Sequence, residues 1–327
     1  MVRCGISSAA VIRWPGATAS DSRCRWARNN APRRGVTSAG LTVSRWVRDR
    51  VPDRWLDSAS AVVADAYCTI PTRRRTTAEA NAYWLTGALE RSVRRRYARS
   101  VFRHLLRCNI DLLGLPGTGA QAILDRIDVF GFDALDQARQ VGRGVLVVGC
   151  HLGNFELAAI GIAALGGPVS VLVESVNPER DAFLARYRTS TGLRLITVDA
   201  KAPREVLRAL ARNEVVIVAG DRALKSGHSS LVPFARGRRP MPDGPAWLAL
   251  KARATIVTGY VVRTPEAARP YRGVFESLLS TDGLGAEPVG ALTARIAMRL
   301  GAAVERYPDQ WFVFDPEWQG TDPAEAL

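Results

Sequence analysis

The feature that most constrains the fold is a series of short Val- and Ile-rich runs that recur along residues 115–320. Examples are GVLVVGC at 144–150, PVSVLVE at 168–174 and VVIVAG at 215–220. Each run is apolar along most of its length, and a segment long enough for a helix follows it. Strands that are buried on both faces have this composition, and helices between them indicate parallel crossovers. We therefore predict an α/β fold with a mostly parallel central sheet flanked by helices on both faces.

The runs and the segments between them define the expected elements of this fold. The predicted strands are residues 144–150, 168–174, 193–198, 215–220, 255–262, 273–279 and 310–315. The predicted helices are residues 118–127, 132–140, 155–165, 178–190, 202–213, 243–253 and 286–306. The α/β domain is expected to span residues 115–320, and residues 321–327 to form a tail.

The chain before this domain has a different composition. Residues 1–110 contain 21 Lys+Arg, all of them Arg, and 7 Asp+Glu, whereas residues 111–327 contain 24 of each. The formal net charge of +14 therefore comes from the first third of the chain. A basic segment joined to a neutral domain indicates an anionic partner, either membrane lipid or nucleic acid. Residues 1–40 show no sustained period, and we interpret them as a disordered tail or a mis-called translation start.

Helical spacing of apolar residues dominates residues 41–114, which we predict to be a basic, amphipathic, helical membrane-docking segment. Thr76 and Glu79 have the spacing of a capping box at the start of its second half. The segment carries Arg91, Arg94, Arg95, Arg96, Arg99, Arg103 and Arg107, and the chain has Trp46, Trp55 and Trp84 for an interfacial zone. A solvated charged face on an ordinary helix would give the same pattern.

A histidine and a glutamate follow the first apolar run, in the stretch HLGNFE. Gly153 permits a tight turn at the strand end, and Asn154 is a favoured cap for the helix that follows. In such a strand–turn–helix, Glu156 lies in the first helical turn and can fold back toward His151. A carboxylate bound to one imidazole nitrogen leaves the other nitrogen to act as a general base. A buried histidine beside an ordinary capped helix is the alternative that these residues leave open.

HLGNFE resembles the H-x4-D/E block of the glycerolipid acyltransferase superfamily. It is most similar to the HxGNWE form of bacterial lipid A lauroyl/myristoyl acyltransferases and phosphatidylinositol mannoside acyltransferases. Two later stretches, VVIVAGDRALKSG and FARGRRPMPDGPAWLALKARATIVTGYVVR, resemble blocks that follow in the same order. The likeness covers about residues 42–318. Phe155, Ala223 and Ala235 depart from the usual Trp, Asp and Gly, and Thr258 stands where these proteins often have proline. The departures at Ala223 and Thr258 leave the acceptor open.

The resemblance assigns roles residue by residue. It implies that His151 is the base that deprotonates an acceptor hydroxyl and that Glu156 orients it. It implies substrate-binding positions at Gly153, Asn154, Glu174, Arg188, Asp221, Arg222, Pro242 and Gly244. Asp221 and Arg222 also follow a predicted strand, at the end of the sheet where α/β proteins usually hold ligands.

The implied reaction moves a fatty acyl chain from acyl-CoA or acyl-carrier protein to a hydroxyl of a membrane glycolipid or lysolipid. We expect no metal and no cofactor beyond that co-substrate, because a thioester is already activated. The five cysteines lack CxxC spacing, which favours a reducing compartment over a disulfide framework. Glycines and a proline interrupt the longest apolar region, so we expect no transmembrane helix. The resemblance and the basic helical segment together predict a peripheral protein at the cytoplasmic face of the plasma (inner) membrane, bound to anionic lipids.

Two other classes of protein would share parts of this pattern. A nucleic-acid-binding protein would explain the basic first third, but the sequence contains no recognisable binding motif, and we expect no nucleic acid partner. A non-catalytic lipid-binding relative would explain the family blocks, but the presence of both His151 and Glu156 favours an active enzyme.

Overall fold

The computed structural model describes residues 50–113, 120–164, 167–175, 185, 188, 192–223, 227–279 and 288–320. The predicted tails at 1–40 and 321–327 lie outside the described residues. Most of the predicted helix 178–190 also lies outside them, although Ala185 and Arg188 are helical.

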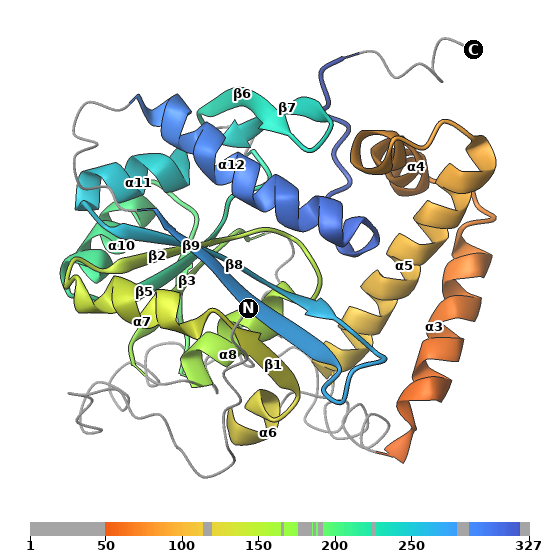
Figure 1. The fold of residues 1–327 in the computed structure, drawn as a ribbon, viewed down its shortest axis with the longest axis horizontal. Helices are drawn as coiled ribbons and strands as arrows, with labels where there is room; N and C mark the ends of the chain where they lie inside the picture. Colours follow the sequence, from red (N-terminus) through yellow and green to blue (C-terminus); the bar gives the residue numbers. More distant parts are fainter. Residues whose placement is uncertain are drawn as a thin grey trace.

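A seven-stranded sheet forms the centre of the fold (Figure 1). Its strands in spatial order are β1 (Ile127–Phe130), β9 (Tyr271–Leu279), β8 (Thr255–Arg263), β2 (Val145–Gly149), β5 (Val215–Ala219), β3 (Val169–Val173) and β4 (Arg194–Thr197). The five strands from β8 to β4 are parallel, whereas β9 is antiparallel to β8 and parallel to β1. The prediction of a mostly parallel sheet is confirmed. The C-terminal ends of the five parallel strands form one edge, called the carboxyl edge below.

Helices cover both faces of this sheet, and alternate side chains of strand β2 pack against the helices of the two faces. Alternate side chains of a strand point to opposite faces. Val145 and Val147 share a core with α6 (Ala120–Leu124), α7 (Phe132–Gln140) and α8 (Phe155–Ala164). Leu146 and Val148 share the other core with α10 (Ala202–Ala211), α11 (Gly244–Ala252) and α12 (Val289–Arg306). A strand buried on both faces has to be apolar throughout, which explains the continuous run that predicted it.

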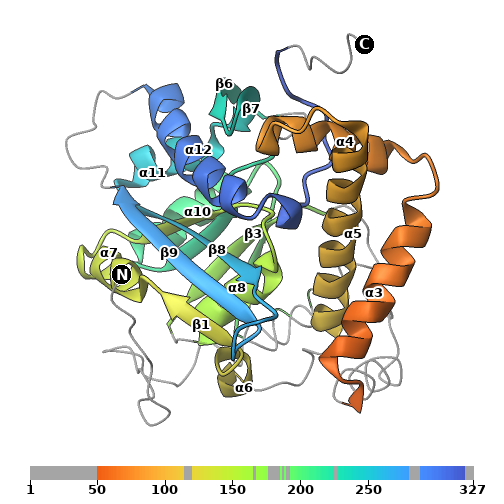
Figure 2. The same cartoon turned by 45° about the vertical axis from the view of Figure 1, so that its right-hand side comes forward.

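Three further helices stand beside the sheet, at the right of Figures 1 and 2: α3 (Asp53–Tyr67), α4 (Arg73–Thr86) and α5 (Arg91–Leu113). They pack together through the buried side chains of Ala64, Ala78 and Phe102. Helices α4 and α5 also bind the chain that follows α12. Asn81 Nδ2 donates to the Val313 carbonyl at 2.9 Å, and the Tyr97 hydroxyl donates to the Pro308 carbonyl at 2.8 Å. The helical segment therefore packs directly on the α/β part of the molecule.

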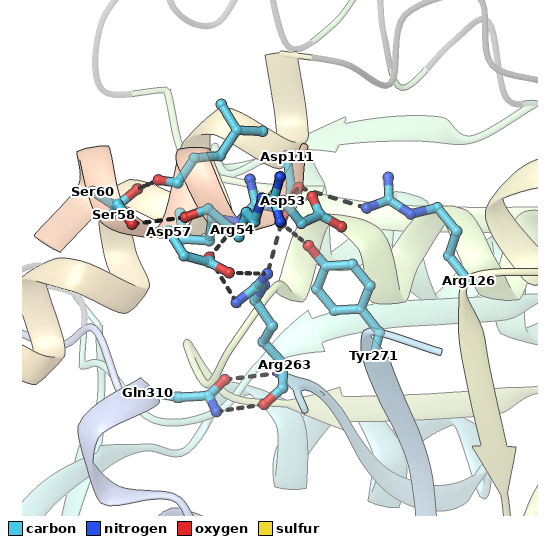
Figure 3. A network of polar contacts seen from close by, with 12 residues as sticks. Asp53, Arg54, Asp57, Ser58, Ser60, Asp111, Arg126, Arg263, Tyr271 and Gln310 are labelled. Atoms are coloured by element: carbon cyan, nitrogen blue, oxygen red, sulfur yellow. Dashed lines mark hydrogen bonds and ion pairs between the residues drawn. The ribbon is translucent and has the colours of Figure 1, made fainter. Parts of the chain in front are cut away.

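A polar network that is buried at Arg107, Asp111 and Arg263 joins these helices to the carboxyl edge (Figure 3). The guanidinium of Arg107 in α5 is only 2% exposed and pairs with Asp53, Asp57 and Asp111. Asp57 also pairs with Arg263, the last residue of β8, at 3.0 Å. Buried charges are stable only when paired, so this network fixes α3 and α5 against the end of a central strand.

Two elements of the α/β part differ from prediction. The predicted helix 118–127 is the short helix α6, and it is followed by β1, the edge strand of the sheet, because pairing with β9 overrides a brief helical pattern. The predicted strand 310–315 is a 3-10 turn (Pro308–Gln310) followed by extended chain, with one bridge between Leu152 and Trp311. Its aromatic side chains pack separately, Trp311 on Phe234 and Phe314 on Phe102, so their apolar character does not come from a ladder.

The structure also contains a hairpin that the sequence did not predict, formed by antiparallel strands β6 (Ser229–Phe234) and β7 (Gly237–Pro242). Pro233, Pro240 and Pro242 lie within it, and prolines are typical of short edge strands that sequence patterns miss.

The predicted capping box at Thr76 is wrong. Helix α4 begins one turn earlier, where the Thr72 hydroxyl accepts from the Arg75 amide at 3.2 Å. Glu79 pairs instead with the Arg75 guanidinium at 2.8 Å, because both lie on one face of the helix at a spacing of four residues.

Candidate active site

The turn between β2 and α8 is held tightly by the rest of the protein. Gly153 has φ +60, and a Cβ there would lie 2.2 Å from the Val261 carbonyl oxygen, so only glycine fits. Its amide donates to the Gln310 carbonyl at 2.7 Å, and the Asn154 amide donates to the Val261 carbonyl at 2.8 Å. The Asn154 side chain accepts from the Leu157 amide at 3.0 Å and caps α8, as predicted.

His151 and Asp221 are brought together by the register of neighbouring strands. Strands β2 and β5 are parallel neighbours, and Gly149 is paired with Ala219. Two residues further along each chain, His151 and Asp221 therefore meet just beyond the carboxyl edge. The Nδ1 of His151 lies 2.8 Å from Oδ1 of Asp221, and the backbone amide of His151 donates to Oδ2 at 2.8 Å.

Asp221 is fully buried and collects its hydrogen bonds from two elements. Its Oδ2 also accepts from the indole Nε1 of Trp311 at 2.8 Å. Burial alone would raise the pKa of Asp221, but His151 and the three donors outweigh it and lower that pKa. Burial likewise opposes the charged form of His151, yet the Asp221 carboxylate raises the His151 pKa above its usual value. The pair therefore holds an anionic carboxylate against Nδ1, and Nε2 is left as the reactive nitrogen.

The predicted hydrogen bond between Glu156 and His151 is wrong. Glu156 is buried in the first turn of α8, and it forms two hydrogen bonds with the Arg188 guanidinium, that from Nε at 2.8 Å. A guanidinium fork matches both carboxylate oxygens, and Asp221 already occupies the nitrogen of the imidazole that Glu156 was expected to bind. Glu156 acts on His151 only through its charge, which favours the protonated ring and raises the pKa of His151.

Two more of the predicted residues gather beside this pair. Glu174, just after β3, forms an ion pair with Arg222, just after β5, and both side chains are partly exposed. The positive charge of Arg222 lowers the pKa of His151, so this side chain lies within electrostatic reach of the imidazole. The carboxyl edge therefore brings His151, Glu156 and Asp221 together with three charged side chains from the next loops.

Pro242 and Gly244 lie apart from this cluster, at the junction of β7 and α11. Between them, the Asp243 carboxylate accepts hydrogen bonds from the hydroxyls of Ser230 and Thr293 at 2.8 Å each. In the described part of the chain, neither Pro242 nor Gly244 hydrogen-bonds to a side chain of the His151 cluster. Pro242 ends β7 and Gly244 begins α11, and their contact with substrate stays a prediction.

Sequence reasoning missed Trp311 and the orienting role of Asp221. Strand ends were the available signal: a carboxylate directly after an apolar run faces the neighbouring run's end when the two strands are adjacent. Strand order was needed to choose between Asp221 and Glu156, and spacing along one chain does not supply it.

The arrangement suits proton transfer from a hydroxyl. The His151 side chain is 25% exposed, so a substrate can reach it, while Asp221 is 0% exposed and is shielded from water. Phe155 packs edge-on against the imidazole at 5.1 Å and limits its rotation. The thiol of neighbouring Cys150 is buried, and burial raises its pKa well above the usual range, which makes it a poor nucleophile.

Comparison with known proteins identifies the family of the chain. The family described as bacterial lipid A biosynthesis acyltransferase matches residues 26–320. The chain belongs to this family. It is therefore an O-acyltransferase of lipid biosynthesis, and the resemblance seen in the sequence is confirmed.

Two curated relatives of the acyltransferase are phosphatidylinositol mannoside acyltransferases. The protein from Mycolicibacterium smegmatis is 27% identical over 235 residues, which cover 68% of this chain and 69% of the relative. The protein from Mycobacterium tuberculosis is 28% identical over 234 residues, which cover 68% and 67% respectively.

Proposed function

We propose that this acyltransferase moves a fatty acyl chain from a thioester donor, acyl-CoA or acyl-carrier protein, to a hydroxyl of a membrane glycolipid, with His151 as the general base. The observation that carries the proposal is the Nδ1 contact between His151 and buried Asp221, which leaves Nε2 at the carboxyl edge. The names of the curated relatives support a glycolipid acceptor.

In this mechanism, Nε2 of His151 removes the proton as the acceptor oxygen attacks the thioester carbonyl. The bond from that oxygen to carbon forms, and the carbonyl electrons move to an oxyanion. Collapse of the intermediate breaks the carbon–sulfur bond, and the imidazolium returns its proton to the leaving thiolate. Asp221 stabilises the imidazolium without taking up the proton, as in other carboxylate–histidine pairs. No metal or further cofactor takes part in these steps.

The oxyanion requires donors that the protein does not already use. The amides of Gly153, Asn154 and Leu157 are bound to protein acceptors. We assign the oxyanion to the remaining amides of the first turn of α8, those of Phe155 and Glu156, where the helix dipole favours negative charge. The Glu156–Arg188 and Glu174–Arg222 pairs flank this position, and in the proposal they contact the polar head of the acceptor.

Docking on the membrane is assigned to the helices beside the carboxyl edge. Helix α3 exposes large apolar side chains, with Trp55 60%, Val62 70% and Val63 53% exposed. On α5, five of the seven predicted arginines face solvent, namely Arg91, Arg95, Arg96, Arg99 and Arg103. Exposed apolar side chains next to arginines are typical of helices that lie on anionic bilayers. Because Arg263 at the carboxyl end of β8 contacts α3, this helix reaches the same edge of the sheet as His151.

Three of the predicted docking residues do not serve this role. Arg94 and Arg107 are buried, and Trp84 is 8% exposed and stacks on Trp318 at 5.5 Å. Among the residues that the structure describes, none of the helices is long and apolar enough to span a bilayer. In the proposal, the protein associates peripherally with the cytoplasmic face of the plasma (inner) membrane.

The catalytic proposal is tested with His151→Gln, assayed for transfer of labelled acyl groups from acyl-CoA to a membrane lipid extract. We expect activity to fall by three orders of magnitude or more, about 4 kcal/mol of transition-state stabilisation. His228→Gln is the matched control, since His228 is exposed and outside the cluster. Mass spectrometry of the products identifies acceptor and chain length. Wild-type turnover by folded His151→Gln would remove His151 as the base.

The docking proposal is tested by flotation with liposomes. A Trp55→Ser, Val62→Ser double variant should bind vesicles with anionic lipid several-fold more weakly than the parent, and added salt should weaken both. Met298→Ser is the control, because Met298 is 62% exposed on α12. Equal binding of the parent to neutral and anionic vesicles would contradict the role of the arginines.

A further inference from the structure

The side chain of Arg239, in strand β7, is buried and has no hydrogen bond among the described residues. Its side chain is 0% exposed, and its Nε and both terminal nitrogens have no acceptor among the described residues. A buried guanidinium normally satisfies its five N–H groups with carboxylates or carbonyls, because desolvation of the charge is costly. Interactions other than a hydrogen-bonded ion pair must therefore stabilise the buried Arg239 cation.

Two indole rings enclose the guanidinium. The Cζ of Arg239 lies 5.0 Å from the ring centre of Trp311 and 5.1 Å from that of Trp318. Both distances are within the range of cation–π attraction, which is strongest for Trp and for desolvated cations. Trp318 is itself fixed, since it stacks on Trp84 and its Nε1 donates to Oδ1 of Asn81 at 2.7 Å. Helix α4 and the chain after α12 thus build a rigid cage for one charge.

One residue of this cage, Trp311, also contacts Asp221. The same Trp311 whose face lies on Arg239 donates its Nε1 hydrogen to Oδ2 of Asp221. When His151 is neutral, as a general base must be, the buried Asp221 carboxylate is an unbalanced negative charge. Burial lowers the pKa of Arg239, and the negative charge of Asp221 is the strongest influence that opposes this effect. Arg239 is thus within electrostatic reach of the carboxylate although no hydrogen bond joins them.

The other charged groups near this system are few among the described residues. The negative charges of Glu317 and Asp315, in the chain after α12, also raise the pKa of Arg239, but less than that of Asp221 does. Both residues are partly exposed, although Oε2 of Glu317 is itself buried and has no hydrogen bond among the described residues. His151 feels Asp221, Arg222 and Glu156, as described above.

We propose that Arg239 is a positioning residue that supplies the counter-charge of the Asp221 carboxylate, and that through Asp221 it sets the proton affinity of His151. The inference rests on the proposed role of His151 as the base. Its sign follows from Coulomb's law: the cation makes the Asp221–His151 pair less negative, so the pair takes up its proton at lower pH than it would without Arg239.

The test measures the titration of His151 by NMR, without substrate or activity. The chain has three histidines, and His151→Gln identifies the signals of the relevant one. In Arg239→Met, which keeps much of the apolar length and loses the charge, the His151 midpoint should rise by about half to one pH unit. In Arg239→Lys, which keeps the charge, it should stay within about 0.2 unit of wild type. An unchanged or lowered midpoint in folded Arg239→Met overturns the proposal.

A second measurement uses the unaltered protein, in case Arg239→Met does not fold. The Nε resonance of Arg239, assigned by its loss in Arg239→Lys, should shift with the His151 midpoint, because the charge of the pair changes there. A resonance that is insensitive to that transition overturns the proposal. These measurements separate the role of Arg239 from the catalytic assignment of His151. If His151→Gln retains acyl transfer, the base is misassigned, but the NMR titrations still decide whether Arg239 and His151 are electrostatically coupled.

Discussion

Replacing Asp221 by asparagine tests which carboxylate orients the histidine. Asp221 accepts from three donors, the backbone amide and Nδ1 of His151 and the indole of Trp311. An asparagine has one oxygen and one NH2 group. If its oxygen keeps the two donors now on Oδ2, its NH2 group faces Nδ1. The imidazole must then carry its proton on Nε2, and Nε2 can no longer accept one from the acceptor hydroxyl.

The expected cost follows from this tautomer change. A carboxylate-to-amide substitution at the equivalent place in Ser-His-Asp hydrolases lowers kcat by about 10⁴. Here we expect a loss of about 10³–10⁴ in kcat for acyl transfer, or about 4–5.5 kcal/mol of transition-state stabilisation. KM for the donor should change little, because Asp221 is fully buried and does not reach it.

Glu156→Gln is the comparison variant, assayed on the same radiolabelled transfer reaction. It keeps one of the two hydrogen bonds to Arg188, and we expect a loss of the order of tenfold, as for one charge-assisted bond of about 1.5 kcal/mol. Circular dichroism and thermal unfolding establish that both variants fold. The reasoning is refuted if Asp221→Asn retains activity within tenfold of wild type, or if Glu156→Gln loses more than Asp221→Asn.

Four further predictions concern pH and stability. Because the pKa of His151 is raised, kcat/KM should fall on the acid side with a midpoint above about 6.5, and a midpoint below 6 in a pH–rate profile would contradict the Asp221 contact. The raised pKa of His151 contributes stability that is fully present below the unfolded pKa of histidine, about 6.5, and is lost as pH rises through the folded pKa. The lowered pKa of Asp221 contributes stability that is present above the unfolded pKa of aspartate, about 3.9, and is lost as pH falls through the folded pKa. Gly153→Ala should lower the free energy of unfolding by about 2–4 kcal/mol in urea titration, because its Cβ meets the Val261 carbonyl, whereas Gly142→Ala, where a Cβ meets nothing within 4 Å, carries only the cost of its positive φ. Asp111→Asn should cost about 3–5 kcal/mol by the same measurement, since it leaves the buried Arg107 guanidinium short of charge, and a loss below 1 kcal/mol would show that the network of Figure 3 is not structural.

Much of the α/β fold could be predicted from the sequence because its physical signal is local. A strand covered by helices on both faces must be apolar at every position, so runs such as that of β2 are visible without any knowledge of their neighbours. Helix α7 was predicted at residues 132–140, where the structure places it, and Gly131 precedes it with φ 70. The hairpin β6–β7 was invisible because its prolines remove the usual strand pattern.

The site was predictable only in part because its decisive contacts are not local. The turn at Gly153 and the cap at Asn154 depend on a few adjacent residues, and both were predicted correctly. The partner of His151 depends on the fact that β5 lies next to β2, although each residue of β2 is 70 positions away in sequence from its partner in β5. Glu156 was nearer in sequence, but Asp221 is nearer in space.

The segment from Gln310 to Phe312 has a consequence for how the enzyme comes into being. Gln310 holds the amide of Gly153, Phe312 donates its amide to the carbonyl of His151, and Trp311 binds Asp221. These clamps are translated long after the residues that they hold. A nascent chain that has already made β2 and β5 therefore carries His151 and Asp221 in unsecured loops. We therefore expect the candidate site to be completed late in synthesis, when this short segment leaves the ribosome, and not when the sheet first forms.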